Sequence, residues 1–284
     1  MHDEAYPLLL IDAGNSRIKW QFRELRAAAP VKGALPTSWM QSDGTVDGTI
    51  AHGLTELTAQ QDPGDGRLLS AISAPKSIWI SNVAGADVAA ALATWLGQQW
   101  PRARRHTVHA AAATCGVTNH YQKPESLGSD RWAGMIGARA AYPNEALLIA
   151  TVGTATTLDA MNADGHFVGG LIAPGWALMM RSLGESTAQL PVLAQDDARS
   201  VPRAKSLGVF AQATPEAIIE GCRLAQAGMI ASAWLQWQNA LNLPVRCLLA
   251  GGAAEDISPA LTIPHTRHDG LVLEGLERIA TQPP

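Results

Sequence analysis

The strongest constraint on the fold is a pattern that occurs twice, once near the start of the chain and once near its middle. A short strand at 6–12, with a continuous apolar run at 8–11, is followed by Gly14-Asn15 and by an alternating segment at 16–23. The same order returns with an apolar run at 146–152, Gly153-Thr154 and an alternating segment at 156–161. Such runs are typical of buried strands, and alternation is typical of strands with one buried face. The repeat therefore predicts two halves that each open with a strand, a glycine turn and a second strand.

Strands and helices alternate through the rest of the chain. Further strands are predicted at 77–83, 107–110, 166–172 and 247–250, and helices at 86–100, 176–186, 215–241 and 271–280. Residues 37–67 are polar and rich in glycine, and 111–124 form the candidate boundary between the halves. We expect a duplicated α/β architecture with a nucleotide cleft between the two halves.

Composition narrows the class of protein. The 284 residues are 47% hydrophobic and 16% charged, which is enough apolar material for a packed core. The formal net charge is −4, without a long run of one sign, so we expect no nucleic-acid partner. No apolar run approaches the length of a membrane span, and the N-terminus lacks the pattern of a signal peptide. Cys115, Cys222 and Cys247 lie far apart, which favours a reducing, cytoplasmic setting.

The first candidate site is the turn from Asp12 to Lys19. Glycine lets a backbone approach a phosphate closely, short polar side chains offer an anion nest, and an aspartate at a strand end can hold Mg²⁺ through water. Taken alone, the segment also fits an ordinary hairpin turn. Its residues are Asp12, Ala13, Gly14, Asn15, Ser16, Arg17, Ile18 and Lys19.

A second glycine turn, Gly153-Thr154-Ala155-Thr156-Thr157, opens the second half. Glycine and hydroxyl groups after a strand can hold phosphate oxygens, although the segment alone also fits a plain turn. Because both halves carry such a turn after their first strand, the pair favours a phosphate clamp.

The third candidate is Gly128-Ser129-Asp130-Arg131. A carboxylate can accept the proton of an attacking hydroxyl in phosphoryl transfer, and a guanidinium can bind a polar or anionic substrate through its fork of donors. The alternative is a surface ion pair of little energetic value.

Two glycine-rich segments follow later strands, at 169–175 and 249–253. Glycine there indicates a close backbone approach, either to a packed element or to a ligand. Gly251-Gly252 could let an adenine or a ribose lie on the backbone.

In this order and spacing, the motifs resemble those of the bacterial type III pantothenate kinases, from residue 8 to about 255. The phosphate motif of that family is matched by Asp12, Gly14, Asn15, Ser16 and Lys19, and its Gly-x-Asp-Arg motif by Gly128, Asp130 and Arg131. Tyr121 stands seven residues before that glycine, as in the family. Further matches are Gly153, Thr154, Ala155, Thr157, Asp159, Gly169, Gly170, Ile172, Pro174, Gly175, Ser182, Leu183, Ala188, Leu190, Pro191, Thr214 and Gly221.

The resemblance implies a fold and an activity. The fold would be two duplicated ribonuclease H-like domains of the actin-like ATPase type, at 1–115 and 116–284, with the nucleotide cleft between them. The activity would be ATP-dependent phosphorylation of pantothenate to 4′-phosphopantothenate, the first step of coenzyme A biosynthesis, by a cytoplasmic homodimer that uses Mg²⁺ with ATP.

The resemblance also implies roles for single residues. Asp130 would be the catalytic base. Residues 12–19 and Thr154 would bind ATP. The substrate residues would be Tyr121, Gly128, Ser129, Asp130, Arg131 and Thr214.

One position departs from the family pattern. Thr151 stands where the family usually has an aspartate that binds a monovalent cation. A neutral hydroxyl is a weaker ligand, so use of K⁺ or NH₄⁺ is in doubt, and we assign no metal ligand. Two alternatives stay open. One is a non-catalytic accessory or activator protein, against which Asp130 argues. The other is a related kinase for a sugar or acetate, against which Tyr121 argues.

Overall fold

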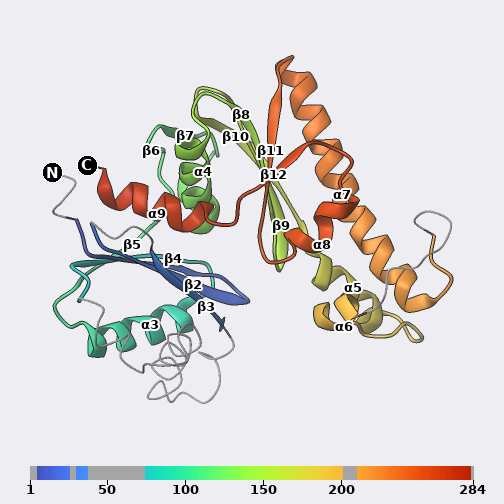
Figure 1. Cartoon of the computed structure of the whole chain (residues 1–284), viewed down its shortest axis with the longest axis horizontal. Coiled ribbons are helices and arrows are strands. Elements are labelled where there is room, and N and C mark those ends of the chain that lie inside the picture. The colour runs from blue at the N-terminus through green and yellow to red at the C-terminus, as the bar shows by residue number, and fades with distance from the viewer. Residues whose placement is uncertain (1–4, 26–29, 38–73, 201–209, 283–284) are drawn as a thin grey trace. The chain divides into compact units, whose positions relative to one another are not determined.

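The computed structural model describes residues 5–25, 30–37, 74–200 and 210–282 (Figure 1). The contacts divide the chain into two compact units, the first made of residues 1–141 and 271–284 and the second of residues 142–270. Each unit is therefore described by itself.

The first unit is built on a five-stranded sheet with the order β3-β2-β1-β4-β5. The strands are β1 (Leu8–Ala13), β2 (Arg17–Arg23), β3 (Val31–Pro36), β4 (Ser77–Asn82) and β5 (Arg104–Thr107). Strands β1, β2 and β3 are antiparallel neighbours, whereas β4 runs parallel to β1 and β5 parallel to β4. All six residues of β1 are buried, as expected for a central strand covered on both faces.

Helices cover both faces of this sheet. Helix α3 (Ala86–Gln99) packs on Leu9, Ile11, Ile78 and Ile80, and α4 (Ser129–Ala141) and α9 (Leu271–Thr281) lie on the other face (Figure 1). Because side chains alternate along a strand, the same central strands supply both cores. The unit is completed by the short strands β6 (Ala113–Thr114) and β7 (Val117–Asn119) and the 3-10 turn Pro124–Ser126.

Helices α4 and α9 cross at glycine residues. A Cβ atom on Gly275 would lie 1.8 Å from the carbonyl oxygen of Ala133, and one on Gly137 would lie 2.1 Å from that of Leu271. The two backbones therefore touch, which fixes the position of α4 on the sheet.

The second unit repeats the strand order of the first. Its strands β10 (His166–Pro174), β9 (Ala155–Met161), β8 (Ala146–Val152), β11 (Val245–Ala250) and β12 (His265–Arg267) are neighbours in that order. Again the first three strands in sequence are antiparallel neighbours, and the last two run parallel to the first and to each other. This mixed five-stranded order is that of ribonuclease H-like domains, so the predicted duplicated α/β fold class is confirmed.

The core of the second unit forms between its sheet and its helices. These are α5 (Trp176–Ser186), α6 (Gln195–Ser200), α7 (Thr214–Leu241) and α8 (Ala254–Ile257), followed by the 3-10 turn Ser258–Ala260. The fully buried Trp176 and Ile230 pack with one face of β8 and β11. None of the helices in the described part of the chain has the length and apolar character of a membrane span.

Most predicted elements agree with the structure, with some corrections. The strand predicted at 107–110 lies at Arg104–Thr107 instead. Strands β3, β6, β7 and β12 and helices α4, α6 and α8 were not predicted. In α4 the seven residues from Trp132 to Ala138 are all buried, so the helix lacks the polar face that would give a helical period. The stretch 37–67 lies almost wholly outside the described residues, and the predicted domain division between 115 and 116 stays a prediction.

Candidate functional site

The turn between β1 and β2 is tight and is held by hydrogen bonds from Thr37. The Gly14 N–H donates to the Arg17 carbonyl at 3.0 Å, which leaves Asn15 and Ser16 exposed at the tip. Thr37, which is buried, donates its hydroxyl to the Gly14 carbonyl at 2.6 Å and its N–H to the Ser16 carbonyl at 3.0 Å. Because Thr37 occupies carbonyl groups, it fixes the turn without using the N–H groups that an anion would need.

Asp12 lies near the end of the central strand β1 and is 8% exposed. It pairs in register with Lys19 on β2 and with Ser81 on β4. Burial raises the pKa of its carboxyl to about 6, while Lys19 opposes the rise and Asp130 adds to it. Its Oδ1 atom is buried and has no hydrogen-bond partner among the described residues. A buried, unpartnered carboxylate oxygen is costly unless a cation or a donor arrives, so this position suits a bound metal ion.

Asp130 stands in the first turn of α4. The hydroxyl groups of Ser129 and Ser81 lie 2.9 Å apart, which ties the start of α4 to the end of β4. The Asp130 Oδ1 atom accepts a hydrogen bond from the Arg131 N–H at 2.8 Å. A Cβ atom on Gly128 would lie 2.7 Å from that oxygen, so glycine there leaves room for the carboxylate.

The first unit therefore brings together two of the predicted groups, the turn 12–19 and the segment 128–131. The charge of Asp130 acts on Asp12, and Lys19 faces Asp12 across the strand pair. Two carboxylates and an ammonium group around one turn can hold a divalent cation, a phosphate and a proton acceptor in one place.

Tyr121 and Arg131 form a second pair beside Asp130. The Arg131 Nη1 atom donates to the Tyr121 hydroxyl at 3.2 Å, and the guanidinium carbon lies 5.7 Å from the centre of the ring. Asn119, which is buried, accepts from the Tyr121 N–H and donates to the Pro124 carbonyl, and so shapes the loop that carries Tyr121.

The second unit holds the other glycine turn, between β8 and β9. The Gly153 N–H donates to the Ala155 carbonyl, and the Gly175 N–H donates to the Thr154 carbonyl, both at 3.0 Å. A Cβ atom on Gly175 would lie 2.0 Å from the Gly153 carbonyl oxygen. Glycine at 175 is thus required by packing against the turn. The Thr154 side chain is exposed, while Thr156 is buried and bonded to Gln226 of α7.

Thr214 is the first residue of α7 and is exposed. It lines a cavity of about 660 Å³ in the second unit, together with Met179, Leu190 and Gly221. Thr154 and Thr214 belong to a different unit from Asp12 and Asp130, so the clamp expected from the two glycine turns stays a prediction.

Thr151 lies on β8 directly opposite Thr157 of β9 and beside Ala250 of β11. Thr151 is half-buried, and the Thr157 hydroxyl is buried without a hydrogen-bond partner in the described part of the chain. Directly opposite residues share a face of the sheet, so this face carries two neutral hydroxyl groups and no charge at these two positions.

Three residues that support the site were missed by sequence reasoning: Thr37, Ser81 and Asn119. Thr37 and Ser81 are distant in sequence from the groups that they hold, whereas Asn119 lies close to Tyr121, and no local motif marks any of the three. Only the register of β4 against β1, which places Ser81 beside Asp12, could have indicated one of them.

Comparison with known proteins identifies the family. The family model described as type III pantothenate kinase matches residues 8–236. The type III pantothenate kinase of Burkholderia vietnamiensis is 52% identical over 276 residues, which cover 97% of each chain. That of Paraburkholderia phymatum is 49% identical over 293 residues, with 98% of this chain and 96% of the relative covered. The chain belongs to the type III pantothenate kinase family. It is therefore a kinase, and both the resemblance and the enzyme class predicted from the sequence are confirmed.

Among solved structures, a conserved putative Baf family transcriptional activator from Campylobacter jejuni is similar, with a TM-score of 0.48 and 17% identity. The alignment covers 95% of this chain and 96% of that one. A likeness of this strength carries no conclusion about function.

Proposed function

We propose that Asp130 is the general base of a pantothenate kinase reaction and that the group around Asp12 receives the phosphates of ATP. The overall reaction follows from the family: the enzyme phosphorylates pantothenate, in the biosynthesis of coenzyme A. The residue roles rest on one geometric observation: Ser81, the register partner of Asp12 on β4, is hydrogen-bonded to Ser129, the residue before Asp130.

In the proposed reaction, the primary hydroxyl oxygen of pantothenate attacks the γ-phosphorus of ATP in line with the bond to the β-phosphate oxygen. That bond breaks, ADP leaves, and the hydroxyl proton passes to the Asp130 carboxylate. The hydrogen bond from the Arg131 N–H keeps one Asp130 oxygen in place, so the other can face the substrate. Positioned base catalysis of this kind contributes about 10²–10⁴-fold.

A divalent cation, which we propose to be Mg²⁺, fits the residues present. Asp12 offers a buried carboxylate oxygen without a partner, and Mg²⁺ beside phosphates commonly uses only one or two carboxylates and several waters. When bound, the ion would neutralise charge on the phosphate oxygens. Lys19 and the N–H groups at the exposed tip of the turn, those of Asn15 and Ser16, would share that task.

For substrate binding, we propose that Arg131 binds a polar or anionic group of pantothenate and that Tyr121 lines the same pocket. Their contact restricts both side chains, which lowers the entropy lost on binding. Gly128 and Ser129 complete the proposed pantothenate-binding group in the first unit. Thr154 would contact the phosphates, and Thr214, at its cavity in the second unit, would contact the substrate.

Three further features belong to the proposal. We infer a homodimer and a cytoplasmic location from the resemblance, and the location is supported by three free cysteines. Dependence on K⁺ or NH₄⁺ is expected to be weak, since Thr151 and Thr157 present hydroxyl groups only.

The test is a direct assay. The purified protein is incubated with Mg-ATP and pantothenate, with and without K⁺ or NH₄⁺, and ADP and phosphopantothenate are measured. Asp130→Asn should lower turnover by about 10²–10⁴-fold and leave ATP affinity nearly unchanged. A fully active Asp130→Asn variant would remove the base assignment. ATP binding without turnover under any cation would favour the accessory-protein alternative, and turnover of a sugar or acetate in place of pantothenate would favour a related kinase.

A further inference from the structure

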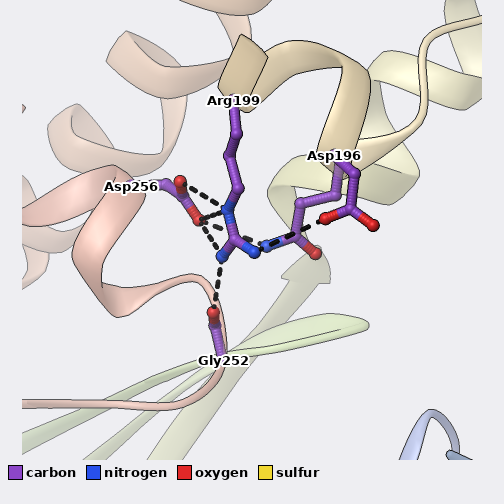
Figure 2. A network of polar contacts seen from close by, with 5 residues as sticks. Asp196, Arg199, Gly252 and Asp256 are labelled. Atoms are coloured by element: carbon purple, nitrogen blue, oxygen red, sulfur yellow. Dashed lines mark hydrogen bonds and ion pairs between the residues drawn. The ribbon is translucent and has the colours of Figure 1, made fainter.

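A polar network joins α6 to the loop after β11 in the second unit. Arg199 of α6 donates from Nη2 and Nε to the Asp256 carboxylate of α8, at 2.7 and 3.0 Å (Figure 2). Its Nη2 atom also donates to the Gly252 carbonyl at 3.1 Å (Figure 2). Gln195 donates to the same carboxylate at 3.2 Å.

This network is stronger than a surface ion pair. The Asp256 side chain is 10% exposed and the Arg199 side chain 37%, so the carboxylate of the pair is largely withdrawn from water. Two parallel N–H donors to one carboxylate also fix the plane of the guanidinium. Helix α6 has six residues, too few to be stable alone, so its attachment depends on such contacts and on the buried Ala198.

The loop held by Arg199 lies directly against the second glycine turn. Gly251 has φ +101°, and a Cβ atom there would lie 2.2 Å from the Val152 carbonyl oxygen. That same oxygen accepts from the Ala253 N–H at 3.1 Å. Since Arg199 fixes the carbonyl of Gly252, it fixes the peptide plane whose N–H belongs to Ala253. The chain of contacts thus runs from Arg199 to Val152, the residue before Gly153-Thr154.

We propose that Arg199 is a positioning residue for the nucleotide, acting through the Gly251–Gly252 loop and the Gly153–Thr154 turn. This inference rests on the proposed ATP site at Thr154. It gives a role to α6, which lies in a segment without a recognised motif. The expected consequence is selective: ATP binding depends on Arg199, and pantothenate binding does not.

The test uses the full-length enzyme and measures ATP binding directly by calorimetry, without pantothenate, alongside steady-state kinetics. Arg199→Ala should weaken ATP binding about tenfold, which corresponds to about 1.4 kcal/mol, and leave the KM for pantothenate within about twofold. Arg199→Lys keeps the positive charge and loses the forked guanidinium donors, so its ATP affinity should lie between those of the wild type and Arg199→Ala. Asp256→Asn should resemble Arg199→Ala. The double variant Arg199→Ala/Asp256→Asn should be no worse than either single variant, because both remove one interaction.

The matched control is Arg181→Ala on α5, which removes an exposed ion pair with Glu185 in the same unit. It should change neither the ATP affinity nor the KM for pantothenate. Unchanged ATP affinity in Arg199→Ala would overturn the proposal. So would an equal loss of affinity for both substrates together with a lowered Tm, since that pattern is a loss of folded protein. Because ATP binding is measured without turnover, this result is separate from the outcome for Asp130.

Discussion

The hydroxyl groups of Ser81 and Ser129 lie 2.9 Å apart in the buried part of the first unit, one at the end of β4 and the other at the first residue of α4. Their hydrogen bond sets the distance between the strand that flanks Asp12 and the residue before Asp130. Two carboxylates that are 118 positions apart in sequence, at 12 and 130, are thereby held on neighbouring elements of one unit.

Ser81→Ala should therefore reduce turnover without removing any group that touches the substrate. The Ser129 hydroxyl would lose its buried partner, at a cost of about 1–3 kcal/mol, and Asp130 would lose its fixed position. We expect kcat to fall by about tenfold with the KM for ATP little changed. Ser77→Ala, on the same strand, is the control, because the Ser77 hydroxyl accepts a hydrogen bond from the nearby Trp79 ring and lies at the far end of β4. Equal effects of both changes would contradict the positioning role.

Asp12→Asn should separate stability from function. The pKa of Asp12 rises from 3.8 in the unfolded chain to about 6 in the folded protein, so the folded state binds the proton more tightly. The stability this gives is complete below about pH 4 and is lost as the pH rises through about 6, by up to about 3 kcal/mol. The neutral amide avoids that loss. We expect the variant to be more stable than the wild type at about pH 7.5, to match it near about pH 4, and to lose turnover.

The measurement for Asp12 is the free energy of urea unfolding at both pH values, together with the phosphorylation rate. A variant that is destabilised at neutral pH would show that the Asp12 carboxylate makes a favourable interaction in the free protein, contrary to its unpartnered Oδ1 atom.

Thr37→Val should loosen the phosphate turn. The substitution keeps the shape of the side chain and removes the hydroxyl that bonds the Gly14 carbonyl. We expect the KM for ATP to rise by about three- to tenfold and the free energy of unfolding to fall by about 1 kcal/mol. Thr94→Val is a fitting control, because its hydroxyl bonds the Ala90 carbonyl on the exposed side of α3. The idea fails if Thr37→Val loses stability and keeps its affinity for ATP.

Gly275→Ala should separate α4 from α9. The added Cβ atom would lie 1.8 Å from the Ala133 carbonyl oxygen, so the two helices must move apart. Asp130, in the first turn of α4, would move with its helix. A loss of about 3 kcal/mol or more in thermal or urea unfolding is expected. At Gly228 of α7 an added Cβ atom meets nothing within 4 Å, so Gly228→Ala should stabilise the protein by about 0.5–1 kcal/mol. Tolerance of Gly275→Ala would mean that this crossing does not hold α4 in place.

Thr151→Asp should create dependence on a monovalent cation. The new carboxylate would stand on β8, opposite Thr157 of β9, where the wild type has only hydroxyl groups at these two positions. We expect K⁺ to accelerate the variant by about tenfold or more, relative to choline, and the wild type by less than about twofold. Thr151→Asn has the shape of the aspartate variant without its charge, so its response to K⁺ should match that of the wild type. Strong activation of the wild type by K⁺ would show that the carboxylate is unnecessary.

Many strands, turns and helices of this protein follow from its local sequence. The segments 6–12 and 146–152 carry apolar runs typical of central strands, and Gly14-Asn15 and Gly153-Thr154 favour turns through their own residue types. Hence the duplicated fold, the hairpins β1–β2 and β8–β9, and long helices such as α7 were predicted from pattern alone. The resemblance that identified the family uses the same segments.

Other features depend on residues that are distant in sequence. Helix α4 is buried nearly all round, so no periodicity marked it. Thr37 and Ser81 support the site from elements that carry no motif. The raised pKa of Asp12 results from its burial in the central strand of the sheet, and the contact between Arg199 and Asp256 requires α6 and α8 to meet. Local sequence determined which segments turn and pair, because turns and strands follow from neighbouring residues; the tertiary structure alone decided which polar groups lose water together, because that depends on long-range packing.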